Sequence, residues 1–191
     1  MKSYRLRDQI LIVILILLVS AGWIWHSRLP VMNQNTPGAA LPQEGFFAPG
    51  FQLKTIDGKD LSLADLRGAP VILNFWASWC PPCRAEMPAF QRVFEDYSSN
   101  DLTIVAINST FQDSLTEVSG FVNDNSLTFP ILLDTTGSVS KSYNLHSLPT
   151  TFFINSQGLI QKIIIGGPIP KALIRIQAEN LLQDDLNVPN D

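Results

Sequence analysis

The chain has 191 residues, 46% of them hydrophobic and 16% charged, which excludes a long disordered protein and a fibrous one. Part of the apolar content lies in one N-terminal stretch, so the remainder suits one domain of modest size. From residue 46 onward, fifteen acidic residues outnumber nine basic ones, and this negative balance argues against a surface for nucleic acid.

The first predicted element is a membrane anchor. Residues 9–27 carry no formal charge, and their number just meets the ~20 apolar residues that a spanning helix needs. Three basic residues precede them and only Asp8 opposes these, so the positive-inside rule places residues 1–8 in the cytoplasm. Everything after Arg28 is then expected outside the membrane.

A cleaved signal peptide is the alternative interpretation of the same stretch. Ser20 and Gly22 offer a small-x-small cleavage site after the aliphatic run. Trp23 and Trp25 instead suit the aromatic belt at a membrane interface, which favours a retained anchor. Either interpretation exports the rest of the chain.

A linker and one folded domain follow. Residues 28–45 are polar, contain three prolines and show no apolar periodicity, which predicts a tether. The folded domain is expected over residues 46–183, with a C-terminal tail at 184–191.

Within the domain, strand-like and helix-like patterns alternate. The predicted elements are strands at 50–53, 61–63 and 71–76, a helix through 87–97, a strand at 102–107, a helix at 114–122, a strand at 131–133, a short helix at 138–143, strands at 151–154 and 159–165, and a helix at 171–182. Asp113 is expected to cap the 114–122 helix. This order predicts an α/β fold with a mixed central sheet and helices on both faces.

The sharpest motif is Trp-Cys-Pro-Pro-Cys-Arg at residues 79–84, between a predicted buried strand and a helix. A cysteine at a helix start lies near unpaired N–H groups and the positive end of the helix dipole, which stabilise a thiolate. We therefore predict Cys80 as the nucleophile, with Cys83 attacking the mixed disulfide that Cys80 forms. Pro81 and Pro82 fit this position, because the first helical turn leaves its N–H groups unpaired in any case.

Other uses of the two cysteines are less consistent with the sequence. A structural zinc ion needs four ligands, and the further imidazole donors are His26, at the membrane edge, and His146. Covalent haem attachment requires histidine directly after Cys83, where Arg84 stands. No metal and no cofactor are expected beyond a redox-active disulfide between Cys80 and Cys83.

The sequence around the motif resembles a known family. Residues 74–88, Asn-Phe-Trp-Ala-Ser-Trp-Cys-Pro-Pro-Cys-Arg-Ala-Glu-Met-Pro, are similar to the active-site stretch of the TlpA/ResA-like thiol-disulfide oxidoreductases. Residues 48–68 resemble that family's opening hairpin, and residues 148–154 its second active-site loop. The resemblance covers roughly residues 44–182. It implies a thioredoxin-like fold with a central helix–strand insertion, anchored by one helix to a bacterial cytoplasmic membrane with the domain on the extracytoplasmic side.

The resemblance also assigns a substrate-binding surface. It implies that Pro149 is cis and faces the disulfide, with the backbone of Leu148 meeting the substrate chain. Sequence alone would favour a trans peptide bond, since only ~5–6% of X-Pro bonds in folded proteins are cis. Trp79, Pro81 and Pro82 are expected on the same surface.

Glu86 has two interpretations. As a plain helical residue it is solvated, because buried glutamate is rare. The resemblance instead implies a semi-buried acid beneath the cysteines, which would raise their pKa or relay a proton to Cys83. Asn74 stands where cytosolic thioredoxins carry a buried acid, so Glu86 would be the only carboxylate near the site.

These features predict a membrane-tethered extracytoplasmic thiol-disulfide oxidoreductase. The resemblance implies a reductase of exported proteins, such as apocytochromes c or copper-site subunits of respiratory oxidases, that receives electrons from a transmembrane dithiol carrier. The motif does not fix the direction, because ~30 mV in reduction potential corresponds to only ~1.4 kcal/mol.

Two other functions stay open. One is a peroxiredoxin-like thiol peroxidase, although Leu73 and Ala77 stand where its Pro-x-x-x-Thr/Ser-x-x-Cys pattern needs proline and a hydroxyl residue. The other is a copper chaperone in which Cys80, Cys83 and His146 bind Cu(I).

Overall fold

The computed structural model describes residues 11, 13–20, 39–97 and 102–186. The chain divides into two compact units, Met1–Pro37 and Gly38–Asp191. In the first unit, residues 13–20 are helical. More than half of the predicted anchor at 9–27 lies outside the described residues, and no helix among the described ones is long and apolar enough to cross a membrane. The anchor therefore stays a prediction.

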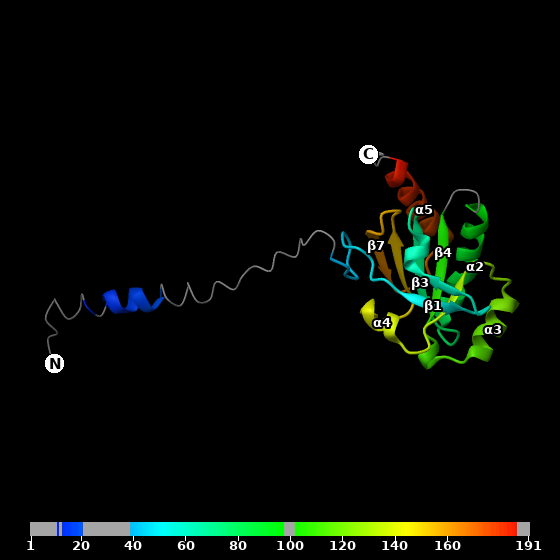
Figure 1. The fold of residues 1–191 in the computed structure, drawn as a ribbon, viewed down its shortest axis with the longest axis horizontal. Helices are drawn as coiled ribbons and strands as arrows, with labels where there is room; N and C mark the ends of the chain where they lie inside the picture. The colour runs from blue at the N-terminus through cyan, green and yellow to red at the C-terminus, as the bar shows by residue number, and fades with distance from the viewer. Residues whose placement is uncertain (1–10, 12, 21–38, 98–101, 187–191) are drawn as a thin grey trace. The chain divides into compact units, whose positions relative to one another are not determined.

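The second unit is built on one seven-stranded sheet in the order β2-β1-β5-β4-β3-β6-β7 (Figure 1). Its elements are β1 (Gln52–Thr55), β2 (Asp60–Ser62), the 3-10 turn η1 (Leu63–Leu66), β3 (Val71–Trp76), α2 (Pro81–Asp96), β4 (Thr103–Asn108), the 3-10 turn η2 (Thr110–Gln112), α3 (Leu115–Asp124), β5 (Ile131–Leu133), α4 (Ser138–Ser142), β6 (Thr150–Ile154), β7 (Ile160–Ile165) and α5 (Lys171–Leu186). β3 pairs in parallel with β4, and β4 in parallel with β5, whereas the other ladders are antiparallel. The predicted mixed sheet is confirmed.

Helices cover both faces of the sheet because its central strands are apolar on both sides. On one face, buried side chains of α2, α3 and α5 form a core with alternate residues of the strands. On the other face, Val139 of α4 and the following Tyr143 pack with Phe75 and Phe152. All six residues of β3 are buried, as the nearly continuous apolar run predicts.

The sheet register brings the loops of two neighbouring strands to the same end of the sheet. Phe75, near the end of β3, pairs with Thr150 at the start of antiparallel β6. The loop that leaves β3 and the loop that enters β6 therefore meet, which places residues 77–80 near residues 147–149. These are the two segments in which the sequence places the site.

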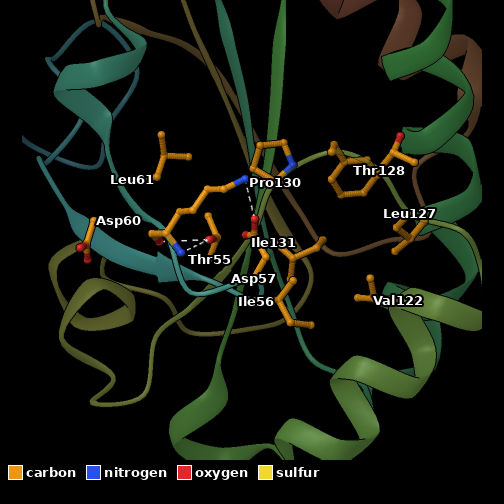
Figure 2. Close-up of a pocket in the computed structure, with 12 residues that line it drawn as sticks. Thr55, Ile56, Asp57, Asp60, Leu61, Val122, Leu127, Thr128, Pro130 and Ile131 are labelled. Atoms are coloured by element: carbon orange, nitrogen blue, oxygen red, sulfur yellow. Dashed lines mark hydrogen bonds and ion pairs between the residues drawn. The ribbon is translucent and has the colours of Figure 1, made fainter.

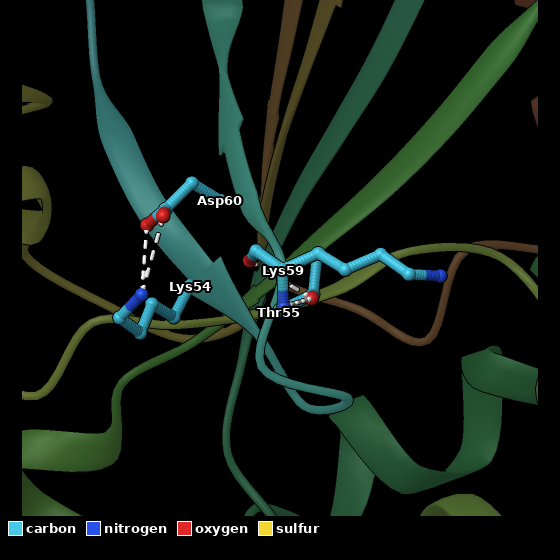
Figure 3. A network of polar contacts seen from close by, with 4 residues as sticks. All are labelled: Lys54, Thr55, Lys59 and Asp60. Atoms are coloured by element: carbon cyan, nitrogen blue, oxygen red, sulfur yellow. Dashed lines mark hydrogen bonds and ion pairs between the residues drawn. The ribbon is translucent and has the colours of Figure 1, made fainter.

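The opening hairpin is confirmed as β1 and β2, joined by a turn in which Gly58 has a φ of 86°. Figure 3 shows the polar contacts that hold it. Lys54 forms an ion pair with Asp60 at 3.1 Å. The Thr55 hydroxyl donates to the carbonyl of Lys59 and accepts from its N–H, both at 3.0 Å.

Three local details differ from the sequence predictions. Asp113 does not cap α3: the helix starts at Leu115 with Ser114 at the N-cap position, where no described side chain makes a capping bond. Residues near the end of the predicted linker pack on β7, since Glu44 accepts a hydrogen bond from the Ile163 N–H at 3.0 Å. The final helix also runs four residues past the predicted 182.

Candidate active site

The two cysteines lie at the start of α2. Cys80 is the N-cap residue, and Pro81 and Pro82 occupy the first two helical positions. A disulfide joins Cys80 to Cys83, with Cα atoms 5.3 Å apart, and the Cys83 N–H lies 3.3 Å from the Cys80 sulfur. Both cysteines are buried, whereas Pro81 is exposed and Pro82 half-buried. Pro81 and Pro82 carry no N–H, so the helix start presents one N–H, that of Cys83, to the Cys80 sulfur.

The second loop carries a cis proline. The Leu148–Pro149 peptide bond is cis, as the resemblance implies. Pro149 is buried, and its carbonyl accepts a hydrogen bond from the Gly166 N–H at 2.8 Å. Leu148 is half-buried and packs against the apolar cluster that includes both cysteines.

Glu86 is buried rather than solvated, with 1% of its surface exposed. One carboxyl oxygen accepts from the Asn74 amide and the other from the Ile169 N–H, both at 2.9 Å. Burial raises the pKa of Glu86 to about 7, although the two hydrogen bonds act to lower it. Cys83 lies three residues earlier, so its side chain and that of Glu86 share one buried face of α2.

The backbone at Gly167 packs between the side chains of Glu86 and Pro149. A Cβ atom at this position would lie 2.5 Å from a Glu86 carboxyl oxygen and 2.7 Å from Cγ of Pro149. The backbone after β7 thus fills the space between them, which only glycine allows. The next peptide bond, Gly167–Pro168, is also cis. Gly167 and Ile169 are not among the residues predicted from the sequence, although the Gly-Gly-Pro run at 166–168 signals a special backbone conformation there.

A polar network fixes the loop that precedes Cys80. The Asp113 carboxylate accepts from the Ser78 N–H at 2.6 Å, the Ser78 hydroxyl at 2.5 Å and the Asn108 amide at 2.8 Å. Burial acts to raise the pKa of Asp113, but these bonds and one from the Ser114 N–H outweigh it and hold the pKa below its ordinary value. The residue expected to cap a helix instead anchors the active-site loop.

Trp79 and Arg84 flank the cysteines at the surface. The indole N–H of Trp79 donates to the Gln112 carbonyl at 3.0 Å, and 55% of the side chain is exposed. Arg84 donates to the Ser78 carbonyl at 3.2 Å, and its guanidinium lies 4.5 Å from the centre of the Phe121 ring. Both side chains therefore have hydrogen-bond partners on neighbouring loops although they are exposed.

Two cavities lie on different parts of the domain. One, of about 370 Å³, borders Trp79, His146 and Leu148. The other, of about 390 Å³, lies between the β1–β2 hairpin and the connection from α3 to β5 (Figure 2). Neither cavity is lined by a cysteine or by Glu86, but the first is lined by Trp79 and Leu148, which directly precede Cys80 and the cis Pro149, so it is the cavity that borders the cysteine pair. In the part of the chain that the structure describes, no group of three His, Cys, Asp or Glu residues is placed to hold a metal ion.

Curated relatives of this chain are thiol-disulfide oxidoreductases. ResA of Bacillus subtilis is 32% identical over 176 residues, which cover 92% of this chain and 89% of the relative. Sporulation thiol-disulfide oxidoreductase A of the same organism is 41% identical over 133 residues, 68% of this chain and 80% of the relative. The thioredoxin-like protein YneN of B. subtilis is 46% identical over 125 residues, 65% and 72% of the two chains.

Solved structures agree with this similarity. StoA from B. subtilis superposes with a TM-score of 0.61 at 36% identity, covering 73% of this chain and 98% of that one. A secreted disulfide oxidoreductase of Mycobacterium tuberculosis, homologous to E. coli DsbE, gives 0.63 at 26% identity, covering 69% and 96%.

The fold and the cysteine pair define a thiol-disulfide oxidoreductase of the ResA/StoA type with a thioredoxin-like fold. The model of the AhpC/TSA family matches residues 45–163, and the chain belongs to that family. The resemblance seen in the sequence is thereby confirmed. Disulfide-containing proteins are the corresponding class of substrate.

Proposed function

We propose that this enzyme reduces disulfides of exported proteins through Cys80 and Cys83. The observation that carries the proposal is the joint placement of the cysteine pair at the helix start, the cis Pro149 loop and the buried carboxyl of Glu86. The cysteine pair supplies a sulfur that ionises, and the Pro149 loop supplies backbone groups for the substrate chain to contact. Glu86 supplies a group that exchanges protons near pH 7.

The reaction proceeds by two exchanges. The Cys80 thiolate attacks one sulfur of the substrate disulfide, that S–S bond breaks, and the released substrate sulfur takes up a proton. Cys83 loses its proton and attacks the Cys80 sulfur, so the mixed disulfide breaks and the Cys80–Cys83 bond forms. The second substrate thiol leaves with a proton, and two electrons and two protons have passed to the substrate.

Glu86 would exchange the proton of Cys83. A carboxyl with a pKa of about 7 is present in both protonation states at neutral pH, so it can accept a proton and return it. Its ionised form would also oppose the thiolates electrostatically and raise their pKa. Pro149 and Leu148, with Trp79, Pro81 and Pro82, would form the surface that the substrate chain contacts.

The tether and partners complete the proposal. Residues 1–8 would lie in the cytoplasm, residues 9–27 would form the single-pass anchor and residues 28–45 the linker to a domain over 46–183. The domain would act outside the membrane, as does the secreted mycobacterial relative. A transmembrane dithiol carrier would return electrons to the Cys80–Cys83 disulfide, and apocytochromes c or copper-site subunits of respiratory oxidases are the proposed substrates.

Trapping of mixed disulfides tests this assignment. In the full chain, Cys83→Ser removes the resolving thiol, so substrate proteins should stay bound to Cys80 and be released by dithiothreitol. Cys80→Ser is the matched control and should trap none. Mass spectrometry of the trapped bands would name the substrates. Equal trapping by the two variants, or trapping only by Cys80→Ser, would contradict the assigned roles.

A further inference from the structure

Asn74 is a buried polar residue whose side-chain amide connects three elements of the domain. It lies on β3 directly opposite Thr151 of β6 in the sheet register, and it is 1% exposed. The amide nitrogen donates to a Glu86 carboxyl oxygen and to the Thr151 hydroxyl, both at 2.9 Å. Both hydrogens of the amide are therefore used, and they join β3 to α2 and to β6.

The oxygen of the same amide is unpaired. Oδ1 of Asn74 is buried and has no hydrogen-bond partner among the residues that the structure describes. Buried polar atoms are nearly always paired, so this oxygen requires an explanation. A planar amide that turns over by half a rotation exchanges its oxygen and its nitrogen at nearly the same positions. Turned over, Asn74 would present Oδ1 to Glu86 and Thr151, and it would leave its nitrogen where the oxygen now stands.

Glu86 needs different partners in its two protonation states. In the structure each carboxyl oxygen accepts a hydrogen bond, one from the Asn74 amide and one from the Ile169 N–H, which suits the ionised acid. A protonated carboxyl must also donate its O–H, and an amide nitrogen accepts no hydrogen bond. The turned amide of Asn74 offers the missing acceptor at the same place.

Thr151 allows the amide to turn without losing its own hydrogen bond. A hydroxyl group both donates and accepts. Thr151 accepts from the Asn74 nitrogen in the structure, and after the turn its hydroxyl would donate to Oδ1. Thr151 is fully buried, so this bond is shielded from bulk water in both orientations. The two orientations therefore differ chiefly in the proton of Glu86 that they suit.

The described residues supply no ionic partner that shifts the pKa of Glu86. Burial raises this pKa, and hydrogen bonds from the Ile169 N–H and the Asn74 amide act to lower it. The elements that pack on the carboxyl face it with uncharged groups, β3 with Asn74 and the segment after β7 with Gly167 and Ile169. On α2 the titratable neighbour is Cys83, which the disulfide holds. The orientation of the amide therefore depends on the proton of Glu86 and not on a neighbouring ion.

We propose that Asn74 is a positioning residue whose amide turns over when Glu86 gains or loses a proton, so that Glu86 keeps a hydrogen-bond partner in both states. The inference rests on the proposed function, in which Glu86 exchanges the proton of Cys83. Asn74 takes up no proton itself. It allows the carboxyl to accept and return the proton without leaving its buried position.

Nuclear magnetic resonance of the oxidised full chain in detergent micelles tests the turn, because no cysteine titrates in the disulfide form. The samples carry isotope labels in the asparagine amides, the threonine methyl groups and the glutamate carboxyls, and Asn74→Leu identifies the Asn74 signal by its loss. The nuclear Overhauser effect between the Asn74 NH2 protons and the Thr151 methyl group should be present at pH 8.5 and lost at pH 5. The loss should occur over the pH interval in which the Glu86 carboxyl signal titrates.

Two controls accompany the native measurement. Glu86→Gln carries an NH2 donor at both pH values, so its Asn74 should stay turned and show no effect to Thr151 at either. Asn108 is an internal control, because it is buried, donates to Asp113 at 2.8 Å and accepts from the Thr110 hydroxyl at 2.9 Å. Both ends of this amide are paired, and the pKa of Asp113 lies below its ordinary value, so the Asn108 signals should not change between pH 5 and 8.5.

A kinetic variant tests the role of Asn74 in the reaction. The reduced full chain reacts with Ellman's reagent in two phases, and the second phase is the release of thionitrobenzoate when Cys83 attacks the mixed disulfide on Cys80. Asn74→Leu keeps the approximate shape without either end of the amide. It should slow the second phase at pH 7 by about tenfold, less than the ~10²-fold or more that a proton-transfer group itself contributes. Asn123→Leu, at an exposed position on α3, is the control and should keep the native rate.

The outcomes separate this inference from the proposed function. A contact between the Asn74 NH2 group and Thr151 that persists at pH 5 while Glu86 titrates, or that persists in Glu86→Gln, would overturn the turn and leave the proposed function standing. Equal second-phase rates for the native chain and folded Asn74→Leu would overturn the positioning role. Absence of the second phase in the native chain would overturn the proposed function itself. Urea unfolding checks that the variants fold, and the native resonance measurement holds without them.

Discussion

Replacing Glu86 by glutamine should remove a pH dependence of stability that the native chain carries. The glutamine side chain has the shape and neutral charge of the protonated carboxyl. Its oxygen can accept from the Ile169 N–H, and its NH2 group can donate to Oδ1 of Asn74 if the Asn74 amide turns over, since that oxygen has no hydrogen-bond partner among the described residues. Native Glu86 must instead ionise in a buried position as the pH rises. The two proteins should therefore differ in how their free energy of unfolding responds to pH.

The magnitude follows from the pKa. Burial raises the pKa of Glu86 from an ordinary 4.5 to about 7. At ~1.4 kcal/mol per pH unit, this difference corresponds to about 3 kcal/mol. Between pH 4.5 and 7 the folded chain binds more protons than the unfolded chain, so native stability falls as the pH rises through this window. Below the window both forms are protonated and above it both are ionised, so the effect levels off.

Urea unfolding of the oxidised proteins from pH 4 to 8.5 measures the effect without interference from thiol titration. The difference between native chain and Glu86→Gln should change by about 3 kcal/mol across the window, in favour of the variant at high pH. Glu117→Gln, an exposed position on α3, is the control and should follow the native curve. Parallel curves for native chain and Glu86→Gln would refute the reasoning.

Three further predictions concern neighbouring positions and the rival chemistry. Gly167→Ala should lower the unfolding free energy by about 1–3 kcal/mol, because its Cβ would enter occupied space, whereas Gly50→Ala has no atom within 4 Å to meet. Urea unfolding at pH 7 compares them, and equal losses would count against the close contact. Asp113→Asn should also cost about 1–3 kcal/mol at pH 7 and much less below pH 3.8, since an acid with a lowered pKa loses its contribution as the pH falls. Asp60→Asn, which removes an exposed ion pair, should cost less than about 1 kcal/mol; a similar loss in both would contradict the assigned network. Hydrogen peroxide should oxidise the reduced chain no faster than free cysteine in stopped-flow assays, and rapid turnover would favour the peroxidase alternative.

Much of the architecture was predictable because it depends on local patterns. The apolar run of β3, the three-to-four spacing on α2 and the turn at Gly58 each specify their element within a few residues. Placement of the Cys-Pro-Pro-Cys motif followed from the junction between β3 and α2. The cis bond before Pro149 came from the family resemblance and not from any local rule.

Contacts between distant segments were not predictable. Glu86 receives its hydrogen bonds from Asn74 on β3 and from Ile169 after β7, which lie 12 and 83 residues away. Asp113 looked like a helix cap because the sequence shows its neighbours and not Ser78, 35 residues away. The N–H and hydroxyl of Ser78 need an acceptor, and satisfying them outweighs the local preference of Asp113 for a helix-cap position.

The reduction potential of the Cys80–Cys83 pair tests the central claim most directly. Equilibration of the full chain with dithiothreitol mixtures, followed by alkylation and mass spectrometry, gives the potential and identifies the thiols. We predict that both cysteines appear together as a two-electron couple with a potential of about −270 mV, the value typical of thioredoxin. A potential of about −120 mV, the value of DsbA, would make the enzyme an oxidase and contradict the proposed reduction of substrate disulfides.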